Sequence, residues 1–215
     1  MNLLYKICRK GAYLYYKLFF KFEIEGFDQI DWSQNYVVCG NHLNLQDPFV
    51  IGGLLPISTR FMAKKELFKH RIVAAFLTKI GVFPVDRDAN DLKAIKTALG
   101  ILKNGESLGL FPEGTRNKGY EPLEVKAGMS MLAIKTKTPV LAITIDSFYK
   151  FRKPLRVVFH EPIDLSQYYD QKLTSDEFEV ISKSILDKIY YDLKYYSTEN
   201  EPKNKIWATS TKANS

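Results

Sequence analysis

The chain has 215 residues, 46% hydrophobic and 26% charged, which is enough to bury one substantial core, so we expect one globular domain. The 31 lysines and arginines outnumber the 24 aspartates and glutamates, and the net charge of +7 favours an anionic partner. Every apolar run is broken by charged residues before it reaches the roughly 18 residues of a membrane-spanning helix, which excludes a polytopic membrane protein. With only two cysteines, Cys8 and Cys39, a disulfide-rich scaffold is excluded as well.

Residues 1–22 are predicted to form an amphipathic helix of their own. Its apolar stripe recurs at three-and-four spacing and comprises Leu3, Leu4, Ile7, Cys8, Gly11, Leu14, Tyr15, Leu18, Phe19 and Phe22. The other side has no acidic residue and carries Lys6, Arg9, Lys10, Lys17 and Lys21, with the rings of Tyr13 and Tyr16. A basic, aromatic-rich helix of this kind is typical of a membrane interface. The alternative is a surface helix that packs its apolar stripe against the core.

Residues 23–196 alternate apolar strand candidates with helical stretches, which indicates an α/β domain with a largely parallel mixed sheet flanked by helices. The predicted strands span residues 36–40, 60–63, 82–85, 107–111, 140–145 and 156–160. One helix is predicted from Leu92 to Leu102, and a last helix starts at Thr174, where Glu177 completes a capping box. The polar residues 197–215 are predicted to be a poorly ordered tail.

The first of these strands is followed by a histidine, His42, at the position where open α/β sheets place their ligand sites. A histidine that acts as a base needs a partner that fixes its tautomer, and Asp47 is the nearest carboxylate in the sequence. On one continuous helix the two side chains would point about 140° apart, so they can meet only if His42 precedes the helix. The pair Asp47-Pro48 predicts that a helix begins here, with Asp47 as its N-cap and Pro48 at its first helical position. The alternative is that Asp47 only caps this helix.

A second polar loop follows the strand predicted at 107–111 and reads Phe111-Pro112-Glu113-Gly114-Thr115-Arg116. The guanidinium of Arg116 can bind a phosphate bidentately, and Gly114 allows the backbone to approach a ligand closely. The alternative is a tight turn in which Glu113 and Arg116 form an ion pair.

Further cations follow other predicted strands. Arg87 comes after the strand at 82–85 and can face the same ligand as Arg116. Lys64 and Lys65 belong to a basic stretch that suits an anionic acyl carrier or the membrane surface. The alternative for this stretch is a solvated helix face, where lysine and arginine usually lie.

Four blocks resemble the glycerolipid acyltransferase family, specifically its bacterial 1-acylglycerol-3-phosphate (lysophosphatidate) acyltransferases. They are Asn41-His42 with Asp47, which is the HX4D motif, Val85 with Arg87, Phe111 to Arg116, and Thr138 to Ile143. The resemblance covers residues 36–145. This chain has Gly40 before the Asn-His pair and Asn44 two residues after the histidine, where the family commonly has serine. These departures leave the acceptor and acyl-chain preferences open.

The resemblance implies an enzyme in which His42 is the general base, Asp47 orients it, and Glu113, Gly114, Thr115 and Arg116, with Arg87, bind the acceptor phosphate. The implied reaction moves a fatty acyl chain from acyl-CoA or acyl-carrier protein to the sn-2 hydroxyl of lysophosphatidate and gives phosphatidate, without a metal or redox cofactor. A positioned imidazole suits this chemistry because a glycerol hydroxyl is a poor nucleophile at neutral pH. The expected location is the cytoplasmic face of the cell membrane, as a peripheral or monotopic protein on an anionic surface.

Other functions fit some of the same residues. Another lysolipid or glycerol 3-phosphate would also present a phosphate to the basic side chains, and a non-catalytic module that binds phospholipid at the membrane would keep the same pocket. A nucleic-acid partner is not expected, because the basic charge comes without an RNP motif, a zinc finger or a basic-aromatic stripe.

Overall fold

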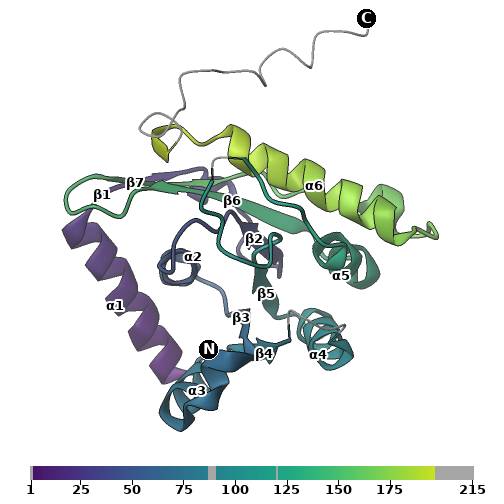
Figure 1. The fold of residues 1–215 in the computed structure, drawn as a ribbon, viewed down its shortest axis with the longest axis horizontal. Coiled ribbons are helices and arrows are strands. Elements are labelled where there is room, and N and C mark those ends of the chain that lie inside the picture. Colours follow the sequence, from purple (N-terminus) through teal and green to yellow (C-terminus); the bar gives the residue numbers. More distant parts are fainter. Residues whose placement is uncertain (1, 87–90, 120, 197–215) are drawn as a thin grey trace, which may run out of the picture.

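The computed structural model describes residues 2–86, 91–119 and 121–196, and within them the strands form one seven-stranded sheet in the order β1-β7-β6-β2-β5-β3-β4 (Figure 1). The strands are β1 (Lys21–Glu25), β2 (Val37–Gly40), β3 (Thr59–Lys64), β4 (Phe83–Val85), β5 (Ser107–Leu110), β6 (Val140–Ser147) and β7 (Pro154–Phe159). The α-helices are α1 (Leu3–Phe19), α2 (Asp47–Leu54), α3 (Arg71–Lys79), α4 (Leu92–Lys103), α5 (Gly128–Thr136) and α6 (Ser175–Tyr191). Short 3-10 helices span Phe27–Gln29, Lys65–Lys69 and Ser166–Tyr168.

The sheet is mostly parallel, which confirms the predicted α/β fold. β6, β2, β5, β3 and β4 run in the same direction, β7 is antiparallel to β6, and β1 is parallel to β7. The carboxyl ends of the parallel strands therefore meet at one edge of the sheet, where α/β folds bind their ligands.

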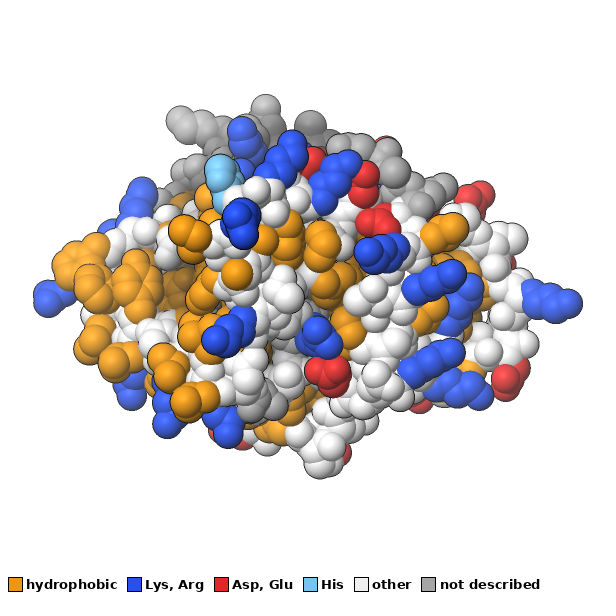
Figure 2. All heavy atoms as spheres, turned by 90° about the horizontal axis from the view of Figure 1, so that it is seen from below, with side chains coloured by type: hydrophobic (Ala, Val, Ile, Leu, Met, Phe, Trp, Pro, Cys, Tyr) orange, Lys and Arg blue, Asp and Glu red, His pale blue; other side chains and the backbone are white. Residues whose placement is uncertain are grey.

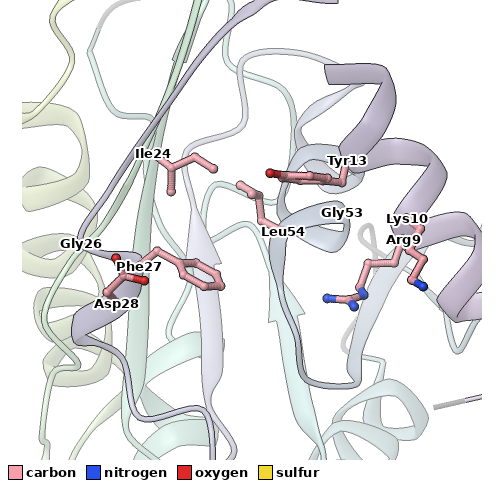
Figure 3. A pocket seen from close by; sticks show the side chains of 9 residues that line it. All are labelled: Arg9, Lys10, Tyr13, Ile24, Gly26, Phe27, Asp28, Gly53 and Leu54. Carbon is pink, nitrogen blue, oxygen red and sulfur yellow. The ribbon is translucent and has the colours of Figure 1, made fainter. Parts of the chain in front are cut away.

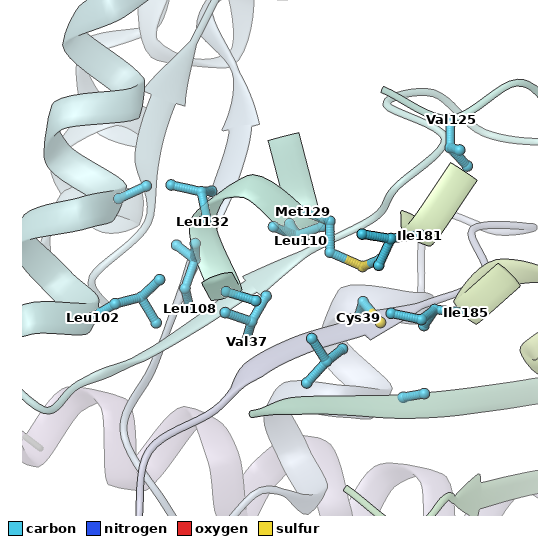
Figure 4. Close-up of a cluster of buried hydrophobic side chains, with 14 of the residues drawn as sticks. Val37, Cys39, Leu102, Leu108, Leu110, Val125, Met129, Leu132, Ile181 and Ile185 are labelled. Carbon is cyan, nitrogen blue, oxygen red and sulfur yellow. The ribbon is translucent and has the colours of Figure 1, made fainter. Parts of the chain in front are cut away.

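Helices cover both faces of this sheet. Along β2, Val37 and Cys39 belong to the core beneath α4, α5 and α6, whereas Val38 belongs to the core beneath α1 and α2. Figure 4 shows the first of these cores, where Met129 of α5 and Ile185 of α6 lie around the strands. Because β2 buries both of its faces, it consists of apolar residues and glycine and shows no alternation.

The structure differs from the sequence prediction at the N-terminus and in one helix. The predicted helix over residues 1–22 ends at Phe19, because Phe20 adopts an extended backbone and Lys21 enters the edge strand β1. α5 was not predicted because it is buried at consecutive positions and shows no one-sided apolar stripe. α3 corresponds to the alternative interpretation of the basic stretch as a solvated helix face. The predicted tail at 197–215 lies outside the described residues.

α1 packs against α2 through a face that the sequence did not single out. Tyr16 is buried on this face, Arg9 donates a hydrogen bond to the carbonyl of Leu55 over 3.2 Å, and Ala12 lies against Gly53. A Cβ atom added at Gly53 would lie only 3.2 Å from the Ala12 Cβ, so the glycine permits the close approach of the two helices. Tyr16 and Arg9, both on the predicted basic side of the helix, therefore contact the protein itself.

The apolar stripe of α1 points to solvent. Leu3 is 74% exposed, Ile7 58%, Leu14 55% and Leu18 66%. The alternative in which this stripe packs against the core is therefore wrong. None of the helices in the described residues is both long and apolar enough to cross a membrane.

Candidate active site

The carboxyl edge of the sheet brings together loops that are distant in sequence. Gly40 of β2 pairs with Ile143 of β6, and Cys39 pairs with Leu110 of β5. The loops that follow these three strands consequently lie side by side. They supply His42, Glu113 and Tyr149 to one site.

His42 and Asp47 form a buried pair at the end of β2. The imidazole Nδ1 lies 3.0 Å from Asp47 Oδ2, and the two residues are 7% and 0% exposed. Because an ionised carboxylate can only accept hydrogen bonds, Nδ1 carries the hydrogen and Nε2 keeps the lone pair. The pair that the sequence predicted is thus assembled with the tautomer that a general base requires.

Asp47 acts on the loop before α2 and not as a helix cap. The N-cap residue is Gln46, and Asp47 is the first residue of α2. Its Oδ2 accepts the backbone N–H groups of Leu43 and Asn44 at 2.8 and 2.7 Å. The helix begins at Asp47, as predicted, but the expected N-cap role is wrong because the carboxylate points back to the histidine loop.

The other oxygen of Asp47 contacts a residue that the sequence analysis missed. Tyr149, in the connection from β6 to β7, donates its hydroxyl hydrogen to Asp47 Oδ1 over 2.6 Å. Burial and the negative charge of Asp47 raise the pKa of Tyr149, so its hydroxyl stays protonated and remains a donor. The two residues are 102 positions apart, and no local pattern marks their contact.

Two further contacts hold the histidine loop. The Phe111 ring stacks on the His42 imidazole with 4.2 Å between centroids and 20° between planes. The amide of Asn41 is buried and bonds both backbone groups of Ile145, the N–H and the carbonyl each at 2.8 Å. A Cβ atom added at Gly40 would lie 3.0 Å from the Ile143 carbonyl oxygen, so this position leaves little room for a larger residue.

Glu113 lies beneath the His42 loop and is only 6% exposed. Its Oε2 accepts the backbone N–H of His42 at 3.1 Å. Its Oε1 accepts the Tyr190 hydroxyl at 2.7 Å, the Asn117 side-chain amide at 2.9 Å and the Leu123 N–H at 3.3 Å. The ion pairs of the described residues do not include the alternative one between Glu113 and Arg116. The carboxylate is directed inward and not toward a ligand at the surface.

The rest of this loop reaches the surface. Gly114 has a φ of +65°, a left-handed conformation that glycine adopts without strain, and its N–H bonds the Phe111 carbonyl at 3.0 Å. Thr115 and Arg116 are exposed. The N–H of Asn117 bonds the His42 carbonyl at 2.7 Å, so the loop passes directly beside the histidine.

The region of the chain that contains most of these site residues matches a known protein family. Residues 21–146, more than half of the chain, match the family model described as Acyltransferase. The chain belongs to this acyltransferase family. The matched region includes the His42–Asp47 pair and the loop from Glu113 to Arg116, and it ends before Tyr149.

Two similar bacterial enzymes carry the same name. This acyltransferase is 34% identical over 139 residues to the 1-acyl-sn-glycerol-3-phosphate acyltransferase of Bacillus subtilis, covering 64% of this chain and 69% of that protein. It is 30% identical over 187 residues to the enzyme of that name from Borreliella burgdorferi, covering 79% and 72%. The crystal structure of the 1-acyl-sn-glycerophosphate (LPA) acyltransferase PlsC from Thermotoga maritima matches with a TM-score of 0.69 and 27% identity, covering 88% of this chain and 78% of that one.

The predicted basic residues of the acyltransferase lie farther along the same edge. Lys64 is the last residue of β3, and its Nζ lies 3.7 Å from Glu66 Oε2. Lys65 forms an ion pair with Asp86, which follows β4. In the sheet, β5 separates β3 from the histidine strand β2. Arg87 lies outside the described residues.

A hollow of about 550 Å³ lies elsewhere, between α1, α2 and the segment after β1 (Figure 3). Tyr13, Phe27 and Leu54 give it an apolar lining, and Arg9 and Lys10 lie on the α1 side. It contains neither residue of the His42–Asp47 pair. The candidate active site is therefore the polar cluster at the carboxyl edge of the sheet.

Proposed function

We propose that this acyltransferase moves a fatty acyl chain from an acyl thioester, either acyl-CoA or acyl-carrier protein, to the sn-2 hydroxyl of lysophosphatidate and forms phosphatidate. The observation that carries the proposal is the buried His42–Asp47 pair, in which Nε2 is left as the base. The names of the similar enzymes from Bacillus subtilis and Borreliella burgdorferi support the choice of acceptor.

The proposed reaction is a direct transfer. His42 Nε2 removes the proton of the acceptor hydroxyl while the oxygen attacks the thioester carbonyl carbon. The ester C–O bond forms, the C–S bond breaks, and the proton passes from His42 to the leaving thiolate. Asp47 holds Nδ1–H and stabilises the imidazolium that forms between these steps.

The buried thiol of Cys39 gives no support to an acyl-enzyme route. The side chain is 0% exposed within the core, and burial raises the pKa of its thiol well above its usual range. A thiol that stays protonated is a weak nucleophile, and this one is out of reach of a substrate at the surface. Direct attack by the acceptor hydroxyl therefore remains the proposed step.

In this proposal the acceptor phosphate binds at the exposed end of the loop from Phe111 to Arg116. Arg116 supplies a bidentate donor, Thr115 supplies a further one, and Gly114 lets the backbone approach the phosphate closely. Arg87 keeps its predicted role as a second cation. Glu113 contributes by holding the His42 backbone, since a buried carboxylate surrounded by its own donors is poorly suited to face a phosphate.

An anionic membrane surface is the proposed partner of α1. The exposed leucines of its apolar stripe are accompanied by Lys6, Lys10 and Lys17, which suits the boundary between acyl chains and anionic headgroups. Figure 2 shows hydrophobic side chains mixed with Lys and Arg on the face that holds α3 and the N-terminal end of α1. On α3, Ile72 is 86% exposed and Phe76 41%. Docking by this face is proposed to hold the enzyme at the surface that contains its lipid acceptor.

The decisive experiment incubates the purified protein with lysophosphatidate and a long-chain acyl thioester, beside His42→Ala. Phosphatidate and free thiol are measured together. The wild type should release one thiol for each phosphatidate formed, and His42→Ala should lose roughly 10²- to 10⁴-fold in turnover, the usual contribution of a general base. A folded wild type that forms no phosphatidate from either acyl-CoA or acyl-carrier protein would refute the proposed acceptor and lead to glycerol 3-phosphate and other lysolipids.

A further inference from the structure

Tyr149 lies in a strained turn at the end of β6. Its φ is +53°, a left-handed conformation that costs energy in any residue other than glycine. The turn is fixed by hydrogen bonds from the Tyr149 N–H to Ser147 Oγ at 3.0 Å and from the Arg152 N–H to the Phe19 carbonyl at 2.8 Å. Strained residues that the surrounding structure holds in place are frequent at functional sites, which directs attention to the Tyr149 side chain.

The Tyr149 hydroxyl bonds one of the two oxygens of the Asp47 carboxylate. Oδ1 accepts the hydroxyl hydrogen at 2.6 Å, whereas Oδ2 accepts from His42 Nδ1 and from the N–H groups of Leu43 and Asn44. The carboxylate is thus held from both sides. Without the Tyr149 contact, the carboxylate would be held through Oδ2 alone.

The phenol ring is itself held by α1. Phe20, directly after that helix, packs edge-on against the Tyr149 ring with 6.1 Å between centroids. Tyr16 of α1 is buried alongside, and its hydroxyl bonds the Gln46 carbonyl at 3.4 Å. Within the described chain, the ionisable groups facing Asp47 are therefore His42, Tyr149 and Tyr16. Burial raises the pKa of Tyr16 as well, so both phenols stay neutral.

We infer that Tyr149 is a positioning residue for the acyl transfer: its hydroxyl fixes the Asp47 carboxylate in the plane that orients His42. The inference rests on the proposed function, because it assigns Tyr149 a role in the step that His42 performs. Loss of the hydroxyl misorients the base and lowers kcat, while the substrate sites at Arg116 are untouched.

The test compares Tyr149→Phe with Tyr36→Phe. Tyr36 is the matched control because it is fully buried and donates its hydroxyl to the Asp31 carbonyl at 2.7 Å, far from the site. Tyr149→Phe should lower kcat by about 10- to 100-fold, the effect of a slightly misplaced catalytic group, with KM for lysophosphatidate and thioester unchanged. Tyr36→Phe should keep the wild-type kcat and both KM values.

The outcomes separate this inference from the proposed function. An active wild type whose kcat is unchanged by Tyr149→Phe would overturn the inference and leave the proposed function standing. An inactive wild type would refute the proposed function instead. If Tyr149→Phe does not fold, Ser147→Ala removes the acceptor of the Tyr149 N–H while keeping the phenol. This second variant should lower kcat with both KM values unchanged, and a wild-type kcat would again overturn the inference.

Discussion

The carboxylate of Glu113 accepts a hydrogen bond from the backbone N–H of His42, 3.1 Å away and 71 positions earlier in the chain. The N–H of Asn117 bonds the carbonyl of the same histidine at 2.7 Å. The loop from Glu113 to Asn117 therefore holds the His42 backbone at both of its polar groups. One segment thus supplies Arg116 for the proposed phosphate site and also sets the position of the base.

Replacing Glu113 with glutamine tests this structural role. Both carboxylate oxygens of Glu113 accept hydrogen bonds. A glutamine would replace one of them with an NH2 group, which would face another donor. Glu113→Gln should lower the free energy of unfolding in urea by about 1–3 kcal/mol. Its kcat should fall more than its KM for lysophosphatidate rises, whereas Glu124→Gln, at an exposed position of the following segment, should match the wild type. A rise confined to KM for lysophosphatidate would show that Glu113 contacts the phosphate instead.

Arg116→Ala tests the proposed phosphate site. Loss of a charge-assisted hydrogen-bonding group should raise KM for lysophosphatidate by about 10- to 100-fold, with KM for the thioester unchanged. Arg116 is exposed, so the unfolding free energy should stay within about 0.5 kcal/mol of the wild type. Lys118→Ala, also exposed and two residues along, is the matched control. Equal rises in KM for both substrates would argue against a site for the acceptor phosphate.

The membrane role of α1 is tested by removing two exposed leucines. Leu14→Ser with Leu18→Ser should weaken co-sedimentation with vesicles of anionic phospholipid by at least about tenfold, because each leucine contributes apolar area to the contact. Thermal stability should not change, since both side chains already face solvent in the folded protein. Val180→Ser changes a residue of α6 that is 67% exposed and should sediment like the wild type. Undiminished sedimentation of the double variant would remove α1 from the proposed interface.

The free energy of unfolding should fall in mild acid because His160 becomes protonated. Burial lowers the pKa of His160, partly offset by Asp192, whose Oδ2 lies 3.5 Å from Nδ1. A histidine with a lower pKa in the folded than in the unfolded chain binds protons preferentially when unfolded. Its contribution is therefore fully present above the unfolded pKa of about 6.5 and is lost as pH falls through the lower folded value.

Thermal unfolding of His160→Gln and of the wild type at pH 7.5 and 5.5 checks this expectation. The wild type should lose more stability between the two pH values than His160→Gln does, because the variant has no group to protonate there. His70→Gln, at an exposed position, should follow the wild type. Equal losses in the wild type and His160→Gln would show that other groups carry the acid sensitivity.

Much of the fold was readable from the sequence because its signals are local. The buried parallel strands appear as apolar runs, and the capping box at Thr174 is formed as predicted, with Glu177 in its place. The edge strand β1 was missed because half-exposed residues carry no continuous apolar run. α5 was missed because a helix buried on nearly all sides lacks the periodicity that marks a helix on the surface.

The parts of the site whose partners are close in the chain could be predicted from the sequence. His42 and Asp47 are five residues apart, and Pro48 sets the start of the helix that lets them meet. Three features follow from the packing of the whole chain: the α1 stripe faces solvent, Glu113 turns inward, and Tyr149 bonds the Asp47 carboxylate. The contacts of Glu113 and Tyr149 join loops that the order of the strands in the sheet brings together. Strand order depends on the packing of the whole chain and is not encoded in any short segment.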